Sequence, residues 1–236
     1  MRVNIIRKII QKTGFDLHRY RSAPDRNKFW QSFNIKTILD IGANIGQFAR
    51  EIREVLPKAQ IYSFEPLKEA FGTLEGNFYK DPKFKAFNYA LGDKEEEVEM
   101  HKSAYTPSSS ILKMAEVHKT LFPHTKNSQP EKIIVKKLDD VAKDLNLDTN
   151  GSILIKVDVQ GFEDKVIAGG IETFKKASVV IIENSFVELY KNQPLFDDIY
   201  QKLKTLGFVY KGGLQEKLNK KTGQIISEDS LFIKSL

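Results

Sequence analysis

The chain has 236 residues and a net charge of +6, and its 41% hydrophobic and 29% charged residues are typical of a folded globular protein rather than a disordered one. It contains no cysteine, which excludes disulfides, thiolate nucleophiles and cysteine-based metal sites. No apolar run approaches the ~18 residues that span a bilayer, and the N-terminus has no long apolar stretch of a secretion signal, so we expect a cytoplasmic protein.

The N-terminal segment carries the excess positive charge. Residues 1–28 contain eight Lys or Arg and two Asp, so this segment alone accounts for the net charge of +6. Its apolar residues Val3, Ile6, Ile9 and Ile10 have helical spacing. We expect a basic helical arm at 1–30, followed by a single domain at 31–236. The arm either packs its isoleucines on the body or makes a peripheral contact with an anionic membrane surface.

Strands and helices alternate along the rest of the chain. We expect strands at 37–41, 60–64 and 84–90, with helices at 46–56 and 67–79. Antiparallel strands at 96–103 and 131–138 flank a polar stretch, 104–130. Helices at 138–146, 162–175 and 195–206 then alternate with strands at 152–159 and 178–184, before a terminal hairpin at 208–212 and 230–235.

This order predicts an α/β fold. Alternating strands and helices form a mostly parallel, doubly wound sheet with helices on both faces. The terminal hairpin adds an antiparallel strand at one edge, and the strands near 95–137 form a small β insertion.

A carboxylate follows each of five predicted strands. In a doubly wound sheet the ligand lies beyond the carboxyl ends of the strands, near the point where the strand order reverses. We therefore expect five acids to lie around one site: Asp40, Glu65, Asp93, Asp158 and Glu183.

The turn after the first strand departs from the dinucleotide fingerprint G-x-G-x-x-G. Residues 42–47 read Gly-Ala-Asn-Ile-Gly-Gln, so Asn44 and Gln47 stand where that fingerprint has glycine. Asp40 would repel a pyrophosphate and suits a cationic ligand. Glu65 can accept the ribose hydroxyls of an adenosine, and residues 90–93 can hold its adenine. These features favour S-adenosylmethionine over a nicotinamide cofactor.

Several motifs resemble one known family. They are "ILDIGANIGQFA" (38–49), "YSFEP" (62–66), "NYALGD" (88–93), "VKKLDD" (135–140) and "ILIKVDVQGFEDKVIAGG" (153–170). From about residue 35 onward, the chain resembles the FkbM family of S-adenosylmethionine-dependent methyltransferases. It departs from the common family form at Gln160, where that form has glutamate. The resemblance implies the class I methyltransferase fold, a Rossmann-like sheet of seven strands, and O-methylation of a sugar, a glycan or a secondary metabolite.

The expected site residues follow from these patterns. The expected cofactor-binding residues are Asp40, Gly42, Ala43, Asn44, Gly46, Phe48, Glu65, Pro66, Leu91, Gly92, Asp93 and Asp158. A sugar hydroxyl needs a general base, and Asp158 is the first candidate, Glu183 the second and His101 a third. No metal is expected, because no second and third ligand beside Asp158 are visible. We expect the polar stretch at 104–130 to form part of the acceptor site.

Other functions stay open. An RNA 2′-O-methyltransferase would explain the basic arm, but the body is near neutral and Glu183-Asn184 stands where such an enzyme would have a lysine. The broken fingerprint disfavours a nicotinamide-dependent oxidoreductase. A non-catalytic nucleotide-binding module is a further alternative. We expect a small-molecule or glycan acceptor and no nucleic-acid partner.

Overall fold

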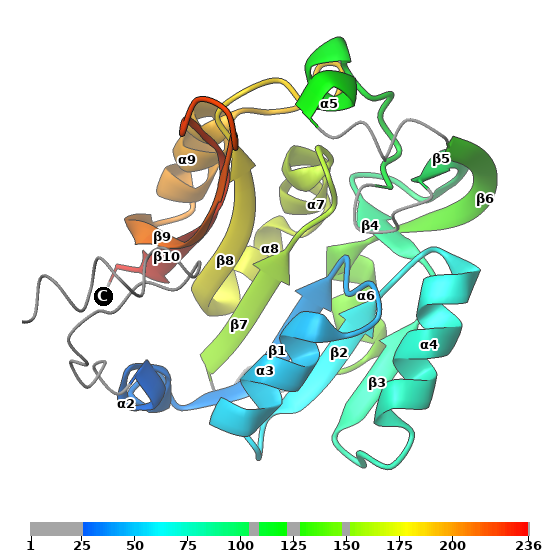
Figure 1. Ribbon diagram of the computed structural model, residues 1–236. Coiled ribbons are helices and arrows are strands. Elements are labelled where there is room, and N and C mark those ends of the chain that lie inside the picture. Colours follow the sequence, from blue (N-terminus) through cyan, green and yellow to red (C-terminus); the bar gives the residue numbers. More distant parts are fainter. Residues whose placement is uncertain (1–25, 104–108, 122–127, 148–151, 236) are drawn as a thin grey trace, which may run out of the picture.

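A central seven-stranded sheet organises the protein (Figure 1). The computed structural model describes residues 26–103, 109–121, 128–147 and 152–235. The strands of the central sheet are β1 (Ile35–Ile41), β2 (Gln60–Phe64), β3 (Phe84–Phe87), β7 (Ser152–Val157), β8 (Ala177–Ser185), β9 (Phe208–Leu218) and β10 (Ile225–Lys234). Their order across the sheet is β3-β2-β1-β7-β8-β10-β9.

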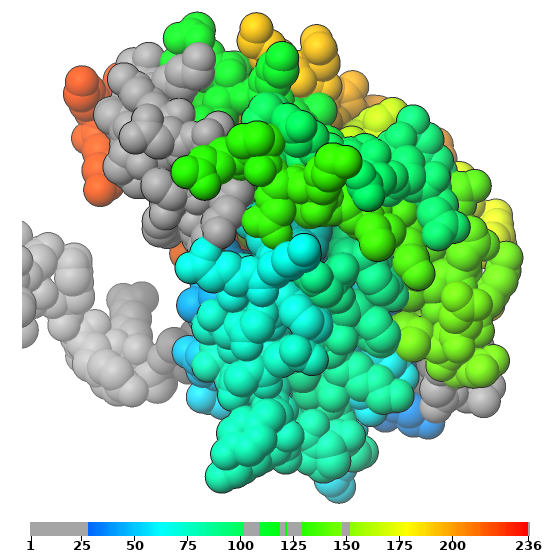
Figure 2. Space-filling model, turned by 90° about the vertical axis from the view of Figure 1, so that its right-hand side faces the viewer, coloured from blue at the N-terminus to red at the C-terminus, as the bar shows by residue number. Residues whose placement is uncertain are grey.

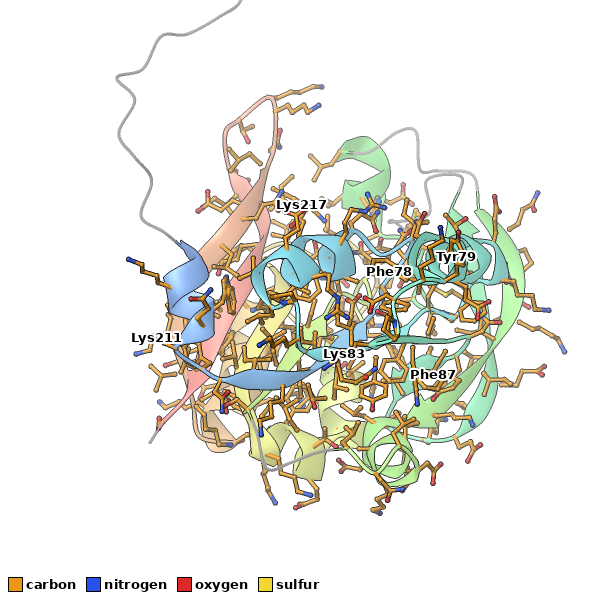
Figure 3. All side chains as sticks on the ribbon, turned by 90° about the horizontal axis from the view of Figure 1, so that it is seen from below. Phe78, Tyr79, Lys83, Phe87, Lys211 and Lys217 are labelled. Carbon is orange, nitrogen blue, oxygen red and sulfur yellow. The ribbon has the colours of Figure 1, made fainter. Side chains whose placement is uncertain are left out.

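Most of this sheet is parallel. Strands β3, β2, β1, β7 and β8 run in one direction, and β10 is antiparallel to both β8 and β9. Strands β3 and β9 therefore form opposite edges, which the separation of Phe87 and Lys211 makes visible in Figure 3. The predicted mostly parallel sheet with an antiparallel hairpin at one edge is confirmed.

Helices cover both faces of the sheet (Figure 1). One face carries α2 (Arg26–Gln31), α3 (Gln47–Val55) and α4 (Lys68–Phe78), and the other carries α6 (Leu138–Asp144), α7 (Glu163–Gly169), α8 (Ile171–Lys176) and α9 (Phe196–Thr205). None of these described helices is long and apolar enough to cross a membrane.

Alternate residues of the central strands pack into two separate hydrophobic cores, one on each face of the sheet. Ile38 of β1 packs in the cluster that includes Ile52 of α3, while its neighbour Leu39 packs in the cluster that includes Leu203 of α9. Because both faces of a parallel sheet are buried, the strand sequences are continuous apolar runs rather than alternating ones. Acids at the ends of such strands are therefore fixed by a rigid framework.

A smaller sheet lies beside the central one. It contains β4 (Ala90–Gly92), β5 (Glu96–Ser103) and β6 (Ser128–Lys137), in the order β4-β6-β5, and a short helix, α5 (Glu116–Leu121), lies between β5 and β6. In the space-filling view, the green residues of this insertion lie above the cyan and teal residues of α4 and β3 (Figure 2). The predicted β insertion is confirmed, but α5 within the polar stretch was not predicted.

The structure corrects the predicted third strand. The sequence favours one strand at 84–90 that ends near Asp93, but β3 ends at Phe87 and residues 90–92 pair with β6 in the smaller sheet. Asn88 makes the break, because its Nδ2 donates hydrogen bonds to the carbonyls of Glu65 at 3.0 Å and Pro66 at 2.8 Å. Asp93 therefore does not follow a strand of the central sheet.

The predicted helix at 162–175 is two helices, α7 and α8, which meet at Gly170. Gly169 lies against β4: a Cβ there would come within 1.7 Å of the Gly92 carbonyl oxygen. The close contact fixes where α7 ends. The terminal hairpin strands are also longer than predicted, and most of the predicted basic arm, residues 1–25, lies outside the described residues.

Candidate functional site

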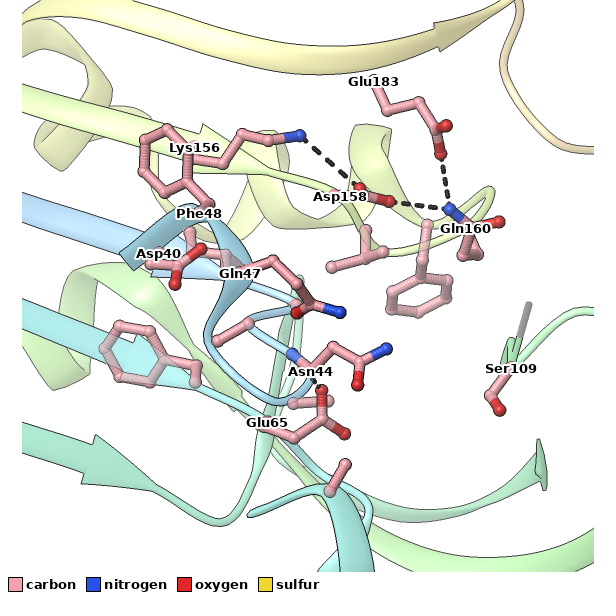
Figure 4. Close-up of a pocket in the computed structure, with 18 of the residues that line it drawn as sticks. Asp40, Asn44, Gln47, Phe48, Glu65, Ser109, Lys156, Asp158, Gln160 and Glu183 are labelled. Atoms are coloured by element: carbon pink, nitrogen blue, oxygen red, sulfur yellow. Dashed lines mark hydrogen bonds and ion pairs between the residues drawn. The ribbon is translucent and has the colours of Figure 1, made fainter. Parts of the chain in front are cut away.

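A cleft of about 390 Å³ opens at the carboxyl ends of the parallel strands (Figure 4). The turn after β1, the residues after β2 and the ends of β7 and β8 line it. This is the expected place for a ligand, because β1 and β7 are neighbours in the sheet but far apart in the chain, so the strand order reverses between them.

The turn from β1 into α3 requires its glycine. Gly42 has φ +83°, and a Cβ there would lie 1.9 Å from the main-chain oxygen of Asp158. The N–H groups of Gly42 and Ala43 both donate to the Phe64 carbonyl at 3.0 Å. The turn is therefore locked to both neighbouring strands, and it presents bare backbone at this point.

Glu65 lies on one side of the cleft, where its carboxylate is held by backbone. Its Oε2 accepts the N–H of Asn44 at 2.9 Å, and its Oε1 accepts the N–H of Leu67 at 2.8 Å. Burial raises the pKa of Glu65 to about 7, although these hydrogen bonds act in the opposite direction. The side-chain Oδ1 of Asn44 is buried without a hydrogen-bond partner among the described residues, so it is free to accept one from a ligand.

Asp40 lies at the base of the cleft between two neighbouring strands. The sheet register places it beside Ser63 of β2 and Lys156 of β7, and Ser63 Oγ donates to its Oδ2 at 3.0 Å. Burial raises the pKa of Asp40 to about 6, against the effects of Ser63 and Lys156. A buried carboxylate with one donor has capacity for another, such as a cationic ligand group.

Lys156 is a buried cation shared by two acids. Its Nζ lies 2.9 Å from Asp229 Oδ1 and 3.6 Å from Asp158 Oδ2. Burial would raise the pKa of Asp158, but Lys156, with help from Lys217, outweighs burial and lowers it to about 2. Asp158 therefore stays ionised at neutral pH, and about a third of its side chain is exposed, at the cleft.

Glu183 lies at the end of β8 beside Asp158. Its Oε2 accepts a hydrogen bond from Gln160 Nε2 at 2.5 Å, and its Oε1 forms an ion pair with Lys217 of β9. Burial above all, and the charge of Asp158, raise the pKa of Glu183 to about 7, while Lys217 opposes them. The pKa values of the two neighbouring acids are therefore shifted in opposite directions.

Most of the predicted site residues line this cleft. Those that do are Asp40, Gly42, Ala43, Asn44, Phe48, Glu65, Pro66, Leu91, Asp158 and Glu183. Four others have different surroundings. Gly46 packs against Phe78, and Gly92 packs against Gly169 of α7.

Asp93 and His101 are the remaining two. Asp93 pairs with Lys165 of α7 at 3.5 Å, away from the cleft lining. His101 follows Met100, which does line the cleft, and side chains alternate along a strand, so His101 faces the other way. Its N–H donates to the Ser110 carbonyl at 2.8 Å.

Sequence reasoning missed two groups of lining residues. One group extends the apolar wall beside Ala90 and Leu91, and it contains Leu67, Ala70, Met100 and Phe162. The other group is polar and comes mainly from the hairpin, and it contains Gln160, Gln215, Lys217, Ser227 and Asp229. The adjacent acids Glu228 and Asp229, between the apolar residues at the two ends of β10, are a signal in the sequence that points to the hairpin.

The cleft thus combines apolar side chains with several acids, which suits S-adenosylmethionine. Ala90 and Leu91 can hold adenine, Glu65 and Asn44 can hold ribose, and Asp40 and Asp158 can face the cationic groups. In the part of the chain that the structure describes, no group of three or more His, Cys, Asp or Glu could hold a metal ion.

The chain is similar to several known proteins. The family model of the methyltransferase FkbM domain matches residues 40–210. The chain is 32% identical over 162 residues to the 2-O-methyltransferase NoeI of Sinorhizobium fredii, and the match covers 66% of each protein. It is 36% identical over 81 residues to the AMB antimetabolite synthetase AmbE of Pseudomonas aeruginosa, covering 34% of this chain and 4% of AmbE. Among solved structures, the precorrin-6y C5,15-methyltransferase of Geobacter metallireducens GS-15 is 12% identical, with a TM-score of 0.44 and 93% of both chains covered.

Proposed function

This chain belongs to the FkbM family of S-adenosylmethionine-dependent methyltransferases, and from that premise we propose that it methylates a hydroxyl of a sugar, a glycan or a secondary metabolite. The observation that carries the proposal is the pair Asp158 and Glu183, two adjacent acids with opposite pKa shifts that line the cleft. NoeI is named as a 2-O-methyltransferase, which supports oxygen as the accepting atom.

The polar lining of the cleft supports a hydroxylated acceptor. Gln215, Lys217 and Ser227 offer hydrogen-bond donors and acceptors in the lining that also contains Glu183, whereas the residues suited to adenine are apolar. Ser109 and Ile111, from the polar stretch that we expected to form part of the acceptor site, also line the cleft.

The proposed roles follow from charge. When bound, S-adenosylmethionine supplies a methyl group activated by a sulfonium. Asp158, ionised beside Lys156, is suited to face that cation. Glu183 is suited to accept the proton of the attacking hydroxyl, because a general base works best with a pKa near the working pH. This order reverses the one expected from the sequence, in which Asp158 was the first candidate.

The cofactor test is calorimetric. We expect S-adenosylhomocysteine to bind and NAD not to bind. Heat from NAD with none from S-adenosylhomocysteine would overturn the cofactor assignment.

The acceptor test uses labelled S-adenosylmethionine. Purified saccharides, a metabolite extract and total RNA are incubated separately with the enzyme and with the Glu183→Gln variant as the control. We expect label in a saccharide or a metabolite, with a mass gain of one methyl. Label in RNA alone would replace the proposed acceptor class with RNA.

A further inference from the structure

The side-chain amide of Gln160 lies between the two carboxylates at the ends of β7 and β8. Its Nε2 donates to Asp158 Oδ1 at 2.7 Å and to Glu183 Oε2 at 2.5 Å (Figure 4). Its Oε1 accepts the hydroxyl of Tyr190 at 3.0 Å. An amide nitrogen has two hydrogens, so each hydrogen serves one acid and the oxygen is fixed by the tyrosine.

The backbone of Gln160 is held as firmly as its side chain. Its φ of 55° is left-handed, and its carbonyl accepts the Ser110 hydroxyl of the insertion at 2.6 Å. The N–H of the next residue, Gly161, donates to both carboxylate oxygens of Glu163 at 3.0 and 3.1 Å. Contacts from the insertion and from α7 therefore place the amide, and the two acids do not draw it into position alone.

The amide lies where repulsion between the acids would be strongest. Two carboxylates that share one site without a donor between them bind one proton jointly. Each acid also pairs with a cation: Asp158 shares Lys156 with Asp229, and Glu183 pairs with Lys217. The charged and titratable groups around Glu183 are Lys156 of β7, Asp158 just after it, Lys217 of β9, Asp229 of β10, Glu163 of α7 and Tyr190 after β8.

We propose that Gln160 is a positioning residue that keeps Asp158 and Glu183 from sharing one proton, so that Asp158 stays ionised and Glu183 alone exchanges a proton. The inference deepens the proposed function, on which the catalytic meaning of Glu183 rests. Gln160 acts through its hydrogen bonds to the acids and holds neither the methyl group nor the hydroxyl itself.

The direct test follows the two carboxyl groups by carbon-13 NMR titration of the whole protein. Resonances are assigned by their loss in Asp158→Asn and Glu183→Gln. In Gln160→Met, which keeps the length and removes both donors, we expect the midpoint of Glu183 to rise by on the order of one pH unit and that of Asp158 to rise as well. Unchanged midpoints would overturn the inference.

Two further variants separate positioning from structure. Tyr190→Phe frees the amide to rotate, so we expect a smaller shift in the same direction, and this variant carries the test if Gln160→Met does not fold. Gln193→Met is the matched control: Gln193 is a buried amide that accepts the N–H groups of Leu189 and Tyr190 and bonds neither acid. Equal midpoint shifts in Gln193→Met and Gln160→Met would show that loss of any buried amide in this region has the same effect, and would overturn the specific role of Gln160.

Activity measurements distinguish this inference from the proposed function. We expect the acid limb of the turnover–pH profile to move in Gln160→Met with the midpoint of Glu183. Full turnover in Glu183→Gln would refute the general-base assignment, whereas the NMR midpoints decide the role of Gln160 independently of that result.

Discussion

The Cα of Gly42 packs directly against the main-chain carbonyl of Asp158, so that a Cβ at position 42 would come within 1.9 Å of that oxygen. Gly42 begins the turn after β1, and Asp158 follows β7, the neighbouring strand. The turn suited to the cofactor and the strand end that carries the acids therefore meet mainly through backbone atoms.

Gly42→Ala tests this contact. The left-handed φ of 83° costs a non-glycine residue about 1–3 kcal/mol, and the clash adds to that cost. We expect a lower free energy of unfolding in urea and loss of S-adenosylhomocysteine binding by calorimetry. The control is Gly72→Ala on α4, where nothing lies within 4 Å, and there we expect a gain of up to about 1 kcal/mol. Wild-type binding by Gly42→Ala would contradict the close packing.

The general-base assignment predicts different losses for the two acids. Glu183→Gln should lower turnover by about 10²–10⁴ with cofactor affinity unchanged, because it removes the proton acceptor and keeps the size. Asp158→Asn should weaken cofactor binding, because it removes the ionised group beside Lys156. Steady-state kinetics at saturating cofactor separate the two effects. A larger turnover loss in Asp158→Asn would return the base role to Asp158.

The ion pair between Lys217 and Glu183 leads us to predict a change in the pH dependence of turnover when Lys217 is replaced. Turnover should rise with pH through about 7, where Glu183 loses its proton, because only the ionised carboxylate accepts one. Lys217 favours the ionised form of Glu183. Lys217→Met should therefore move the acid limb of the turnover–pH profile to higher pH. Lys211→Met is the matched control, since Lys211 is exposed on the same strand and does not line the cleft (Figure 3). If the acid limb of the Lys217→Met profile lies at the same pH as that of the wild type, ionisation of Glu183 does not set that limb.

Glu65→Ala tests the ribose side of the cleft. The substitution leaves the N–H groups of Asn44 and Leu67 without their hydrogen-bond acceptor and removes the acceptor for ribose hydroxyls. We expect S-adenosylhomocysteine to bind more weakly by about 1–3 kcal/mol in calorimetry. Glu54→Ala, an exposed glutamate on α3 outside the cleft lining, serves as the control. Equal affinities of Glu65→Ala and wild type for S-adenosylhomocysteine would show that Glu65 does not contribute to cofactor binding.

Buried acids predict how stability depends on pH. Burial raises the pKa of Asp40 to about 6, of Glu65 to about 7 and of Glu163 to about 8. In the unfolded chain these groups ionise near pH 4. The folded state therefore binds more protons between about pH 4 and 8, and this contribution to the free energy of unfolding is lost as pH rises through that range.

Urea denaturation from pH 5 to 8 measures this effect. We expect the free energy of unfolding to fall across the range, and to fall less steeply in Glu163→Gln, because one of the proton-binding groups is gone. The control is Glu172→Gln, whose side chain is 66% exposed and should leave the slope unchanged. A free energy of unfolding that rises from pH 5 to 8 would contradict the prediction.

The sequence by itself determined the elements that depend on local pattern. Continuous apolar runs marked the buried parallel strands, Gly42 marked the tight turn, and the acids at positions 40, 65, 158 and 183 marked the edge that carries the cleft. These signals are local, because a strand end and the turn that follows it are adjacent in the chain.

Only the tertiary structure decided which distant residues complete the site. Asn88 splits residues 84–92 between two sheets, because its amide bonds the carbonyls after β2. Lys217 and Asp229 reach the cleft because β10 lies antiparallel between β8 and β9, a register that places Asp229 opposite Glu183. The alternation of side chains along a strand determines which residues share a face of the sheet. It does not determine which strand lies beside it, because that depends on the packing of the whole sheet.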